Sequence, residues 1–234
     1  MIPLRFIMLV VGQGAFILIF SILTYKMLSR KKETIVVGFS LFLISVIIAS
    51  ILNIIYSFIV DSSFKVVLHL FTNFFNFFGI GFLYITNQII LKSTLIYTFN
   101  KRLKYLISYG VILLVGMFII AFLTTGVVFN NEGFPIWNPY FFLFMVITVY
   151  SYSIIPVTYT SWQILKELPK DETKKKYIAL FIGTIGLGLL PILVFTANFL
   201  NIYMFRIFVS IIYMTILLWT YLFYFALGRN LRNE

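Results

Sequence analysis

Residues 66–91 form an uncharged run of about 26 residues, with Lys65 and Lys92 at its two ends. As an α-helix this run would be about 39 Å long, more than the roughly 30 Å hydrocarbon core of a bilayer. Its few polar side chains recur at helical spacing and share one face. In lipid, polar groups turn toward other helices or an internal cavity, because contact with acyl chains is costly. We therefore expect a central helix of a membrane bundle whose inward face carries His69, Asn73, Asn76, Tyr84 and Asn87.

The composition of the whole chain agrees with a membrane protein. Of its 234 residues, 62% are apolar and 11% are charged, and the mean hydropathy is +1.04. The charges cluster between long uncharged runs, which is typical of polytopic membrane proteins. We expect an all-α, seven-transmembrane-helix bundle that forms a single domain over residues 1–234. The expected spans are residues 6–27, 35–60, 66–91, 105–129, 140–165, 177–200 and 205–227.

The basic residues are distributed unevenly between the two sides of this bundle. Of the 18 Lys and Arg residues, fifteen fall at Lys26, in alternate connections (29–34, 92–104 and 166–176) and in the tail. The opposite side holds three, Arg5, Lys65 and Arg206. Cytoplasmic loops carry the excess of Lys and Arg, so we expect an outside amino terminus and a cytoplasmic carboxyl terminus. Topology thus accounts for the net charge of +11, and we expect the lipid bilayer of a prokaryotic plasma membrane, not nucleic acid, as the partner.

Several kinds of chemistry lack the residues that they need. The chain has no Cys and one His, which is too few for a zinc site of three or four protein ligands. No Asp, Glu, Lys or Arg falls in the middle of an expected span, although ion-driven carriers and proton relays usually need one. Carboxylate pairs and Ser–base pairs for intramembrane hydrolysis are missing too. We therefore expect neither a metal, nor a cofactor, nor an enzyme.

The polar residues of the second, third, fifth and seventh helices allow two interpretations. They could serve only as interhelical hydrogen bonds, each contributing about 0.6–2 kcal/mol. Alternatively, they could line a pocket of amides, phenols and Phe that suits a small, largely apolar ligand with one or two polar atoms. For the single His the alternatives are a helix-bridging hydrogen bond and a pH-sensing role. The candidate ligand-binding residues are His69, Asn73, Asn76, Tyr84, Asn53, Tyr152, Tyr159 and Tyr213.

Two further groups of residues have both a structural and a functional interpretation. Pro156, Gly183, Gly186 and Pro191 are candidate hinges of the fifth and sixth helices, although static kinks are common in membrane helices. The lysines of the fifth connection anchor the topology, or provide a docking surface for a cytoplasmic signalling partner. These lysines are Lys166, Lys170, Lys174, Lys175 and Lys176.

Two resemblances bear on function. Seven helices with an outside amino terminus resemble rhodopsins and G-protein-coupled receptors in topology, but residues 205–227 contain no Lys for a retinal Schiff base. The run KKKYIALFIGTIGLGLLP, residues 174–191, resembles the seven-helix amino-terminal sensor region of prokaryotic histidine kinases and related signalling proteins. The loop 130–139, with Gly133, two prolines and an interfacial Trp137, is similar to theirs. This resemblance implies a sensor module that acts through a partner, because no output domain follows Leu227.

The sequence therefore predicts a receptor-like or sensor-like membrane protein with a polar pocket around the third helix. A small uncoupled transporter for a neutral solute is the first alternative, since a solute could pass along the same polar stripe. A structural membrane subunit is the second alternative, with amides that only hold helices together.

Overall fold

The computed structural model describes residues 8–29, 34–59, 62–168 and 172–228 of the chain, and these residues are almost entirely helical. Seven of the helices are long and apolar enough to cross a membrane, which indicates a multi-pass membrane protein and confirms the all-α, seven-helix prediction. The elements in order are η1 (Met8–Gln13), α2 (Gly14–Leu28), α3 (Thr34–Ser57), α4 (Ser62–Ile96), α5 (Phe99–Leu123), β1 (Val127–Phe129), β2 (Pro135–Trp137), α6 (Pro139–Val149), η2 (Tyr150–Ile154), α7 (Ile155–Glu167), α8 (Glu172–Leu200), α9 (Tyr203–Tyr213) and α10 (Ile216–Gly228).

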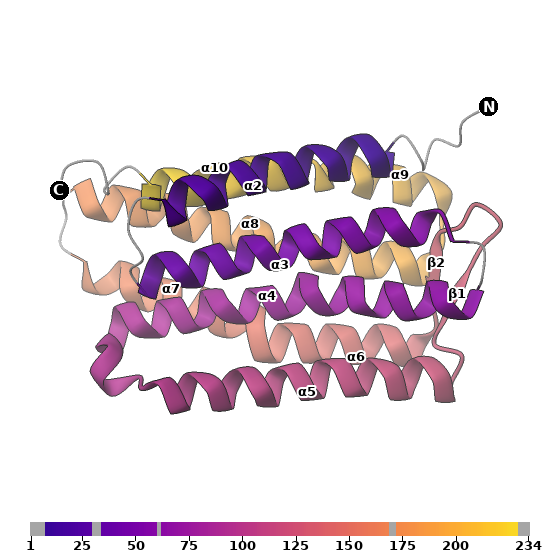
Figure 1. Ribbon diagram of the computed structural model, residues 1–234, viewed down its shortest axis with the longest axis horizontal. Helices are drawn as coiled ribbons and strands as arrows, with labels where there is room; N and C mark the ends of the chain where they lie inside the picture. Colours follow the sequence, from indigo (N-terminus) through magenta and orange to yellow (C-terminus); the bar gives the residue numbers. More distant parts are fainter. Residues whose placement is uncertain (1–7, 30–33, 60–61, 169–171, 229–234) are drawn as a thin grey trace.

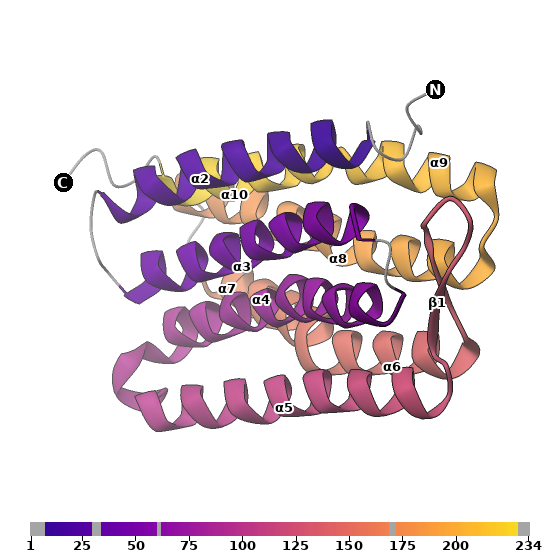
Figure 2. The same ribbon diagram turned by 45° about the vertical axis from the view of Figure 1, so that its right-hand side comes forward.

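The helices lie side by side along the long axis of the molecule, as Figure 1 shows. The α3–α4 pair forms the centre, with α2 and α10 on one side and α5 and α6 on the other. The two short strands pair as an antiparallel hairpin that covers one end of the bundle, seen most clearly in Figure 2. We call this end the hairpin end, and the end that carries the α4–α5 connection the opposite end.

The second and third spans, α3 and α4, meet at small residues. A Cβ atom added at Gly38 of α3 would collide with Oγ1 of Thr86 on α4, and one at Gly79 of α4 would lie 2.9 Å from Cβ of Ser45. Small residues let membrane helices approach closely, which increases the van der Waals contact between them. Glycine at these positions therefore fixes the distance between α3 and α4.

Two clusters of buried apolar side chains fill the bundle on either side of α4. One lies among α2, α3, α8 and α10 and includes Phe16, Phe20, Phe39, Phe42, Leu43, Leu180 and Ile216. The other lies among α4, α5, α6 and the hairpin and includes Leu70, Phe77, Tyr109, Leu113, Trp137, Phe141 and Phe195. Since α4 contributes to both clusters, its side chains occupy the interior, as the sequence predicts for the central helix.

The fourth span differs from its predicted bounds of 105–129. The helix α5 begins at Phe99 and ends at Leu123, because Thr125 adopts a left-handed conformation (φ 47°) and the next residues pair as the hairpin. The expected connection of residues 92–104 is likewise mostly helical. Lys101 Nζ and Arg102 Nε donate to the carbonyls of Ile96 and Tyr97, so basic side chains cap the C-terminal end of α4.

Three of the spans are irregular, although the sequence predicts regular helices there. The first span begins with the π-helical turn η1, and the fifth contains the π-helical turn η2 just before Pro156. The seventh span is interrupted at Met214 and Thr215, whose N–H groups donate to the carbonyls three residues earlier, those of Ile211 and Ile212. Such irregularities occur often at functional sites, and in membranes they are tolerated where the backbone is buried or lines a cavity.

The close approach of α3 and α4 makes a specific prediction about stability. Replacing Gly38 with Ala should lower the Tm by about 2–12 °C, because overpacking costs about 1–3 kcal/mol and each kcal/mol shifts the Tm by about 2–4 °C in a chain of this size. Thermal unfolding of the detergent-purified protein measures this shift. Gly14→Ala is the matched control, because no atom lies within 4 Å of its added Cβ and both variants gain the same helix propensity. Equal Tm values for the two variants would contradict the tight contact.

Candidate functional site

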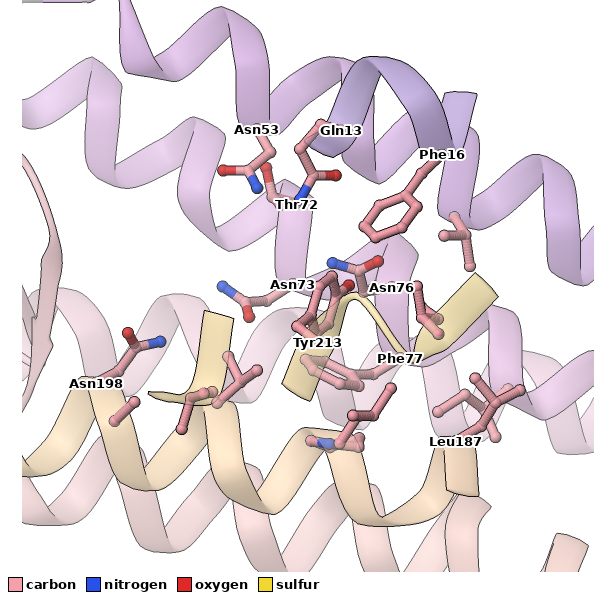
Figure 3. Close-up of a pocket in the computed structure, with 18 of the residues that line it drawn as sticks. Gln13, Phe16, Asn53, Thr72, Asn73, Asn76, Phe77, Leu187, Asn198 and Tyr213 are labelled. Carbon is pink, nitrogen blue, oxygen red and sulfur yellow. The ribbon is translucent and has the colours of Figure 1, made fainter. Parts of the chain in front are cut away.

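A cavity of about 260 Å³ lies inside the bundle, between the two apolar clusters. It is bordered by η1, α2, α3, α4, the hairpin region, η2, α7, α8, α9 and α10, whereas none of its lining residues belongs to α5 or α6. Figure 3 shows labelled side chains of η1, α2, α3, α4, α8 and α9 around it. Most of the lining is apolar. The polar lining residues are Gln13, Asn53, Tyr56, His69, Thr72, Asn73, Asn76, Thr158, Thr184, Asn198, Arg206, Ser210 and Tyr213.

The structure brings five of the eight candidate ligand-binding residues together at this cavity. His69, Asn73 and Asn76 line it from α4, Asn53 lines it from α3, and Tyr213 lines it from the end of α9. They meet because the inward face of α4 points at the gap between α3 and the broken seventh span. Figure 3 shows Asn53, Asn73, Asn76 and Tyr213 around one space.

The other three candidates, Tyr84, Tyr152 and Tyr159, lie outside the cavity, so their predicted place in it is wrong. Tyr84 accepts a hydrogen bond from Gln88 Nε2 at 3.1 Å and packs against Tyr105 at the α4–α5 contact. Tyr152 is 38% exposed and Tyr159 is 54% exposed on the outer surface of the bundle. Tyr159 lies beside Trp162, as is usual for aromatic residues near a membrane interface.

The π-helical turn η2 explains why the stripe predicted for the fifth helix is wrong. A regular helix advances about 100° per residue, and a π-helical turn accommodates an extra residue, so it rotates every later side chain relative to the earlier ones. Ile154, Val157 and Thr158 therefore face the cavity in place of Tyr152 and Tyr159.

His69 belongs to a buried hydrogen-bonded group near the hairpin end. Its Nε2 accepts from Trp137 Nε1 at 3.1 Å and lies 3.0 Å from Asn73 Nδ2. Indole nitrogen is only a donor, so Nε2 is the acceptor and the ring proton lies on Nδ1. Trp137 is 2% exposed and packs against Phe141 and the α8 residue Phe195, so its expected position at a membrane interface is wrong. Hydrogen bonding to the histidine and β-strand pairing hold it inside.

Asn87, on the same stripe of α4, serves as an interhelical link. Its Nδ2 lies 2.8 Å from Ser161 Oγ, 3.1 Å from Thr160 Oγ1 and 3.2 Å from the carbonyl oxygen of Val157. The residue is buried and lies outside the cavity. Here the amide joins α4 to α7, as the purely structural interpretation of the asparagines predicts.

Three amides in the cavity behave differently from Asn87. No hydrogen bond joins the side chains of Gln13, Asn53 or Asn76 to another residue in the described parts of the chain, and Asn53 Oδ1 is a buried atom. Buried polar groups are nearly always hydrogen-bonded, to protein or to another molecule. These three amides come from η1, α3 and α4 and face one space (Figure 3). The arrangement can therefore bind a molecule that both donates and accepts hydrogen bonds.

Arg206 lines the cavity near the hairpin end. It is 6% exposed, and its Nη2 donates to the carbonyl of Pro135 at 2.7 Å and to Asn201 Oδ1 at 3.1 Å. Its Nη1 lies 3.4 Å from Asn198 Oδ1, and its guanidinium lies 4.9 Å from the centre of the Phe134 ring. The guanidinium thus ties α9 to the hairpin and to the end of α8.

Sequence reasoning placed Arg206 only by its charge and did not place Gln13 or Asn198 at the pocket. Gln13 is the one amide in residues 6–27 and stands between two glycines, a sequence pattern that indicates close helix packing. Asn198 and Arg206 lie near the ends of their spans, where polar residues are common. Their burial therefore cannot be predicted from the sequence pattern.

The candidate hinges lie in packed surroundings. Gly186 faces the ring of Trp219 with no room for a Cβ, and Gly183 is buried in the continuous helix α8. Pro191 lies inside α8 and lines the cavity, and Pro156 follows η2 directly. At these positions the glycines allow close packing, and Pro156 follows a local change of helix register. Hinge motion of the helices at these residues stays a prediction.

The lysines of the fifth connection lie at the opposite end. Lys166 Nζ lies 3.6 Å from the centre of the Trp162 ring, and Lys174 Nζ donates to the carbonyl of Leu168 at 3.5 Å. Lys175 is exposed and Lys176 is half-buried, while Lys170 lies outside the described residues, as do Arg5, the basic loop 30–32 and the tail. Their docking role stays a prediction.

The described residues provide no metal site, because no three His, Asp or Glu side chains among them lie close enough to hold an ion. In comparisons with protein-family models, with curated proteins and with solved structures, nothing matches this chain. The cavity and its polar groups are therefore the features that indicate function.

The contrast between the two kinds of amide makes a prediction. Asn87→Leu should lower the free energy of unfolding by about 1–3 kcal/mol, because it leaves Ser161 and Thr160 without their donor. Asn76→Leu should leave it unchanged or raise it, since this amide has no described partner to lose. Thermal unfolding in detergent, after exchange of bound small molecules, compares the two variants. A Tm loss for Asn76→Leu as large as that for Asn87→Leu would show that Asn76 also holds helices together.

Proposed function

We propose that this chain is a receptor-like or sensor-like protein of a prokaryotic plasma membrane, which binds a small, mostly apolar ligand between its helices. The observation that carries the proposal is that the amides of Gln13, Asn53 and Asn76 face one cavity and have no hydrogen-bond partner among the described residues, with Asn53 Oδ1 buried. Amides that only joined helices would be bonded as Asn87 is. This contrast favours a ligand site over the purely structural interpretation.

The core beyond the cavity favours sensing over passage of a solute. Toward the opposite end the interior is filled by buried apolar residues, among them Phe20, Phe39 and Leu180. The next polar groups of α4, at Asn87 and Gln88, are engaged by α7 and by Tyr84. Apolar packing of this kind offers few hydrogen bonds to a polar solute. A pocket that ends inside the protein suits recognition of a ligand.

An uncoupled transporter for a neutral solute is the second candidate, and the break between α9 and α10 favours it. Interrupted helices often form the substrate sites of transporters, near the middle of the bilayer. Tyr213, Met214 and Ile216 all line the cavity at this break. Flux of a neutral solute into protein-containing liposomes, blocked by a bulky residue at the cavity, would support this candidate over the sensor.

Signalling would pass to a cytoplasmic partner at the opposite end, where the lysines of the fifth connection and the end of α10 lie. The support for this step is the resemblance of residues 174–191 to sensor regions of histidine kinases, together with the accumulation of basic residues at this end. A cytoplasmic partner at the opposite end requires that the hairpin end lie on the outer side of the membrane.

The orientation can be tested cleanly because the chain contains no Cys. A cysteine introduced at Asn131, in the hairpin loop, should react with a membrane-impermeant maleimide on intact cells. One introduced at Lys175 should react only after the cells are permeabilised, since the positive-inside rule places it in the cytoplasm. Both positions are exposed. The reverse pattern of labelling would overturn the proposed orientation.

Filling the cavity should remove the bound ligand. Val194 lines the cavity from α8, so Val194→Phe should occupy its space, whereas Leu189→Phe adds the same ring at a site that is 57% exposed on the same helix. Small molecules extracted from protein purified in native lipid discs are compared by mass spectrometry. We expect one species in the wild type and in Leu189→Phe that is at least tenfold depleted in Val194→Phe.

Equal amounts of every small molecule in the three samples would count against a ligand at this cavity. The Tm of each variant is measured to detect a folding defect. If the Tm of Val194→Phe is far below that of the wild type, loss of the ligand could result from unfolding and not from the filled cavity. In that case the smaller change Val194→Leu replaces it.

A further inference from the structure

We propose that the ligand is an uncharged amphiphile, bound with its hydrogen-bonding group at the amides of Gln13, Asn53 and Asn76 and its apolar part against Phe16 and Leu187. This inference rests on the proposed function and specifies the chemistry of the same site. It follows from how polar, apolar and charged groups are divided around the cavity.

Polar and apolar walls lie at different ends of the cavity. In Figure 3, Asn53 lies toward the left of the space and Gln13 and Asn76 lie near its centre, whereas Phe16 and Leu187 lie toward the right. The apolar wall continues into the packed cluster that contains Phe42, Val46, Leu83 and Ile216, all of which line the cavity. A ligand with a polar group at one end and an apolar body matches this division, because each part then meets groups of its own kind.

The free polar groups of the cavity carry no charge. An amide both donates and accepts hydrogen bonds, so it can pair with a hydroxyl, an ester or another amide. Moving an ion from water into a protein interior costs several kcal/mol unless an opposite charge compensates it. Among the described lining residues there is no Asp or Glu to compensate an ammonium group.

Among the described lining residues, Arg206 carries the single full positive charge that an anionic group could meet. The terminal nitrogens of its guanidinium already donate to Pro135, Asn198 and Asn201, and these bonds hold the hairpin end together. His69 Nε2 is an acceptor for Trp137 and so does not offer a proton to an anion from that atom. The cavity is therefore built for a neutral head group.

The size of the cavity limits the ligand. A volume of about 260 Å³ lies just below the range of about 300–1,000 Å³ for pockets that hold drug-sized molecules. A short amphiphile fits this space, whereas a whole two-chain phospholipid does not. Since the three amides come from η1, α3 and α4, one bound head group would connect three elements of the bundle.

Four probes of equal chain length test the head group: octan-1-ol, octanamide, octanoate and octylammonium. Each is titrated into the purified protein in lipid nanodiscs, at a pH at which the last two are ionised, and affinity is taken from the saturable rise of the Tm. The proteins are the wild type, the double variant Asn53→Leu/Asn76→Leu and the control Asn100→Leu. Asn100 is an exposed amide of α5, so its variant reports the general effect of the probe on the bilayer.

We expect octan-1-ol and octanamide each to bind the wild type and Asn100→Leu with the same affinity. The charged probes should bind both proteins at least tenfold more weakly than the neutral probes do. The double variant should lose about fivefold in affinity per amide, or about 25-fold together, the ratio for about 1 kcal/mol per hydrogen bond. A charged probe that binds as tightly as the neutral ones would overturn the inference and leave the ligand site intact.

Two further outcomes would also overturn the inference. If the double variant binds the neutral probes like the wild type, the amides do not hold the head group. If no probe binds saturably, the ligand is not a short amphiphile. The proposal of a ligand site is refuted by a different result, namely equal amounts of every small molecule in the Val194→Phe and wild-type extracts. The two experiments therefore separate the failure of this inference from failure of the proposed function.

Discussion

The whole structure depends on one constraint: in a hydrocarbon environment each polar group must find its partner inside the protein. Asn87 satisfies this constraint by donating to three oxygens of α7. Arg206 satisfies it by donating to oxygens of the hairpin and of α8. His69 meets it through Trp137. Gln13, Asn53 and Asn76 have no hydrogen-bond partner among the described residues, and they surround a single space, whereas other buried groups without a partner, such as Ser40 Oγ and Thr220 Oγ1, lie outside it. The proposed ligand completes the pairing that the chain leaves open.

Irregular backbone surrounds the same space. The π-helical turns η1 and η2, the break before α10 and Pro191 in α8 all contribute residues to the cavity wall. Regular helices packed at small residues, as α3 and α4 are at Gly38, leave little room between them. Three of the seven spans thus depart from regular geometry beside the cavity.

Much of the fold can be predicted from the sequence, because apolar runs and charge clusters identify helices in lipid directly. The inward face of α4 also follows from simple spacing, and His69, Asn73 and Asn76 do line the cavity. Tyr152 and Tyr159 could not be placed, because helical periodicity assumes 3.6 residues per turn and η2 breaks it. The hairpin was also hidden, because only Thr124, Thr125 and Gly126 separate Val127–Phe129 from the apolar run before it, and the strand looks like more helix.

The length of α4 has its own consequence for how the molecule sits in a membrane. With 35 residues it is about 52 Å long, well beyond the roughly 30 Å of hydrocarbon that it has to cross. Such a rod must tilt, or extend through the headgroup layer, and its last residues Leu95 and Ile96 are 86% and 60% exposed. In a bilayer the bundle would thereby be coupled to bilayer thickness through its central helix, the same helix that contributes more polar residues to the cavity wall than any other.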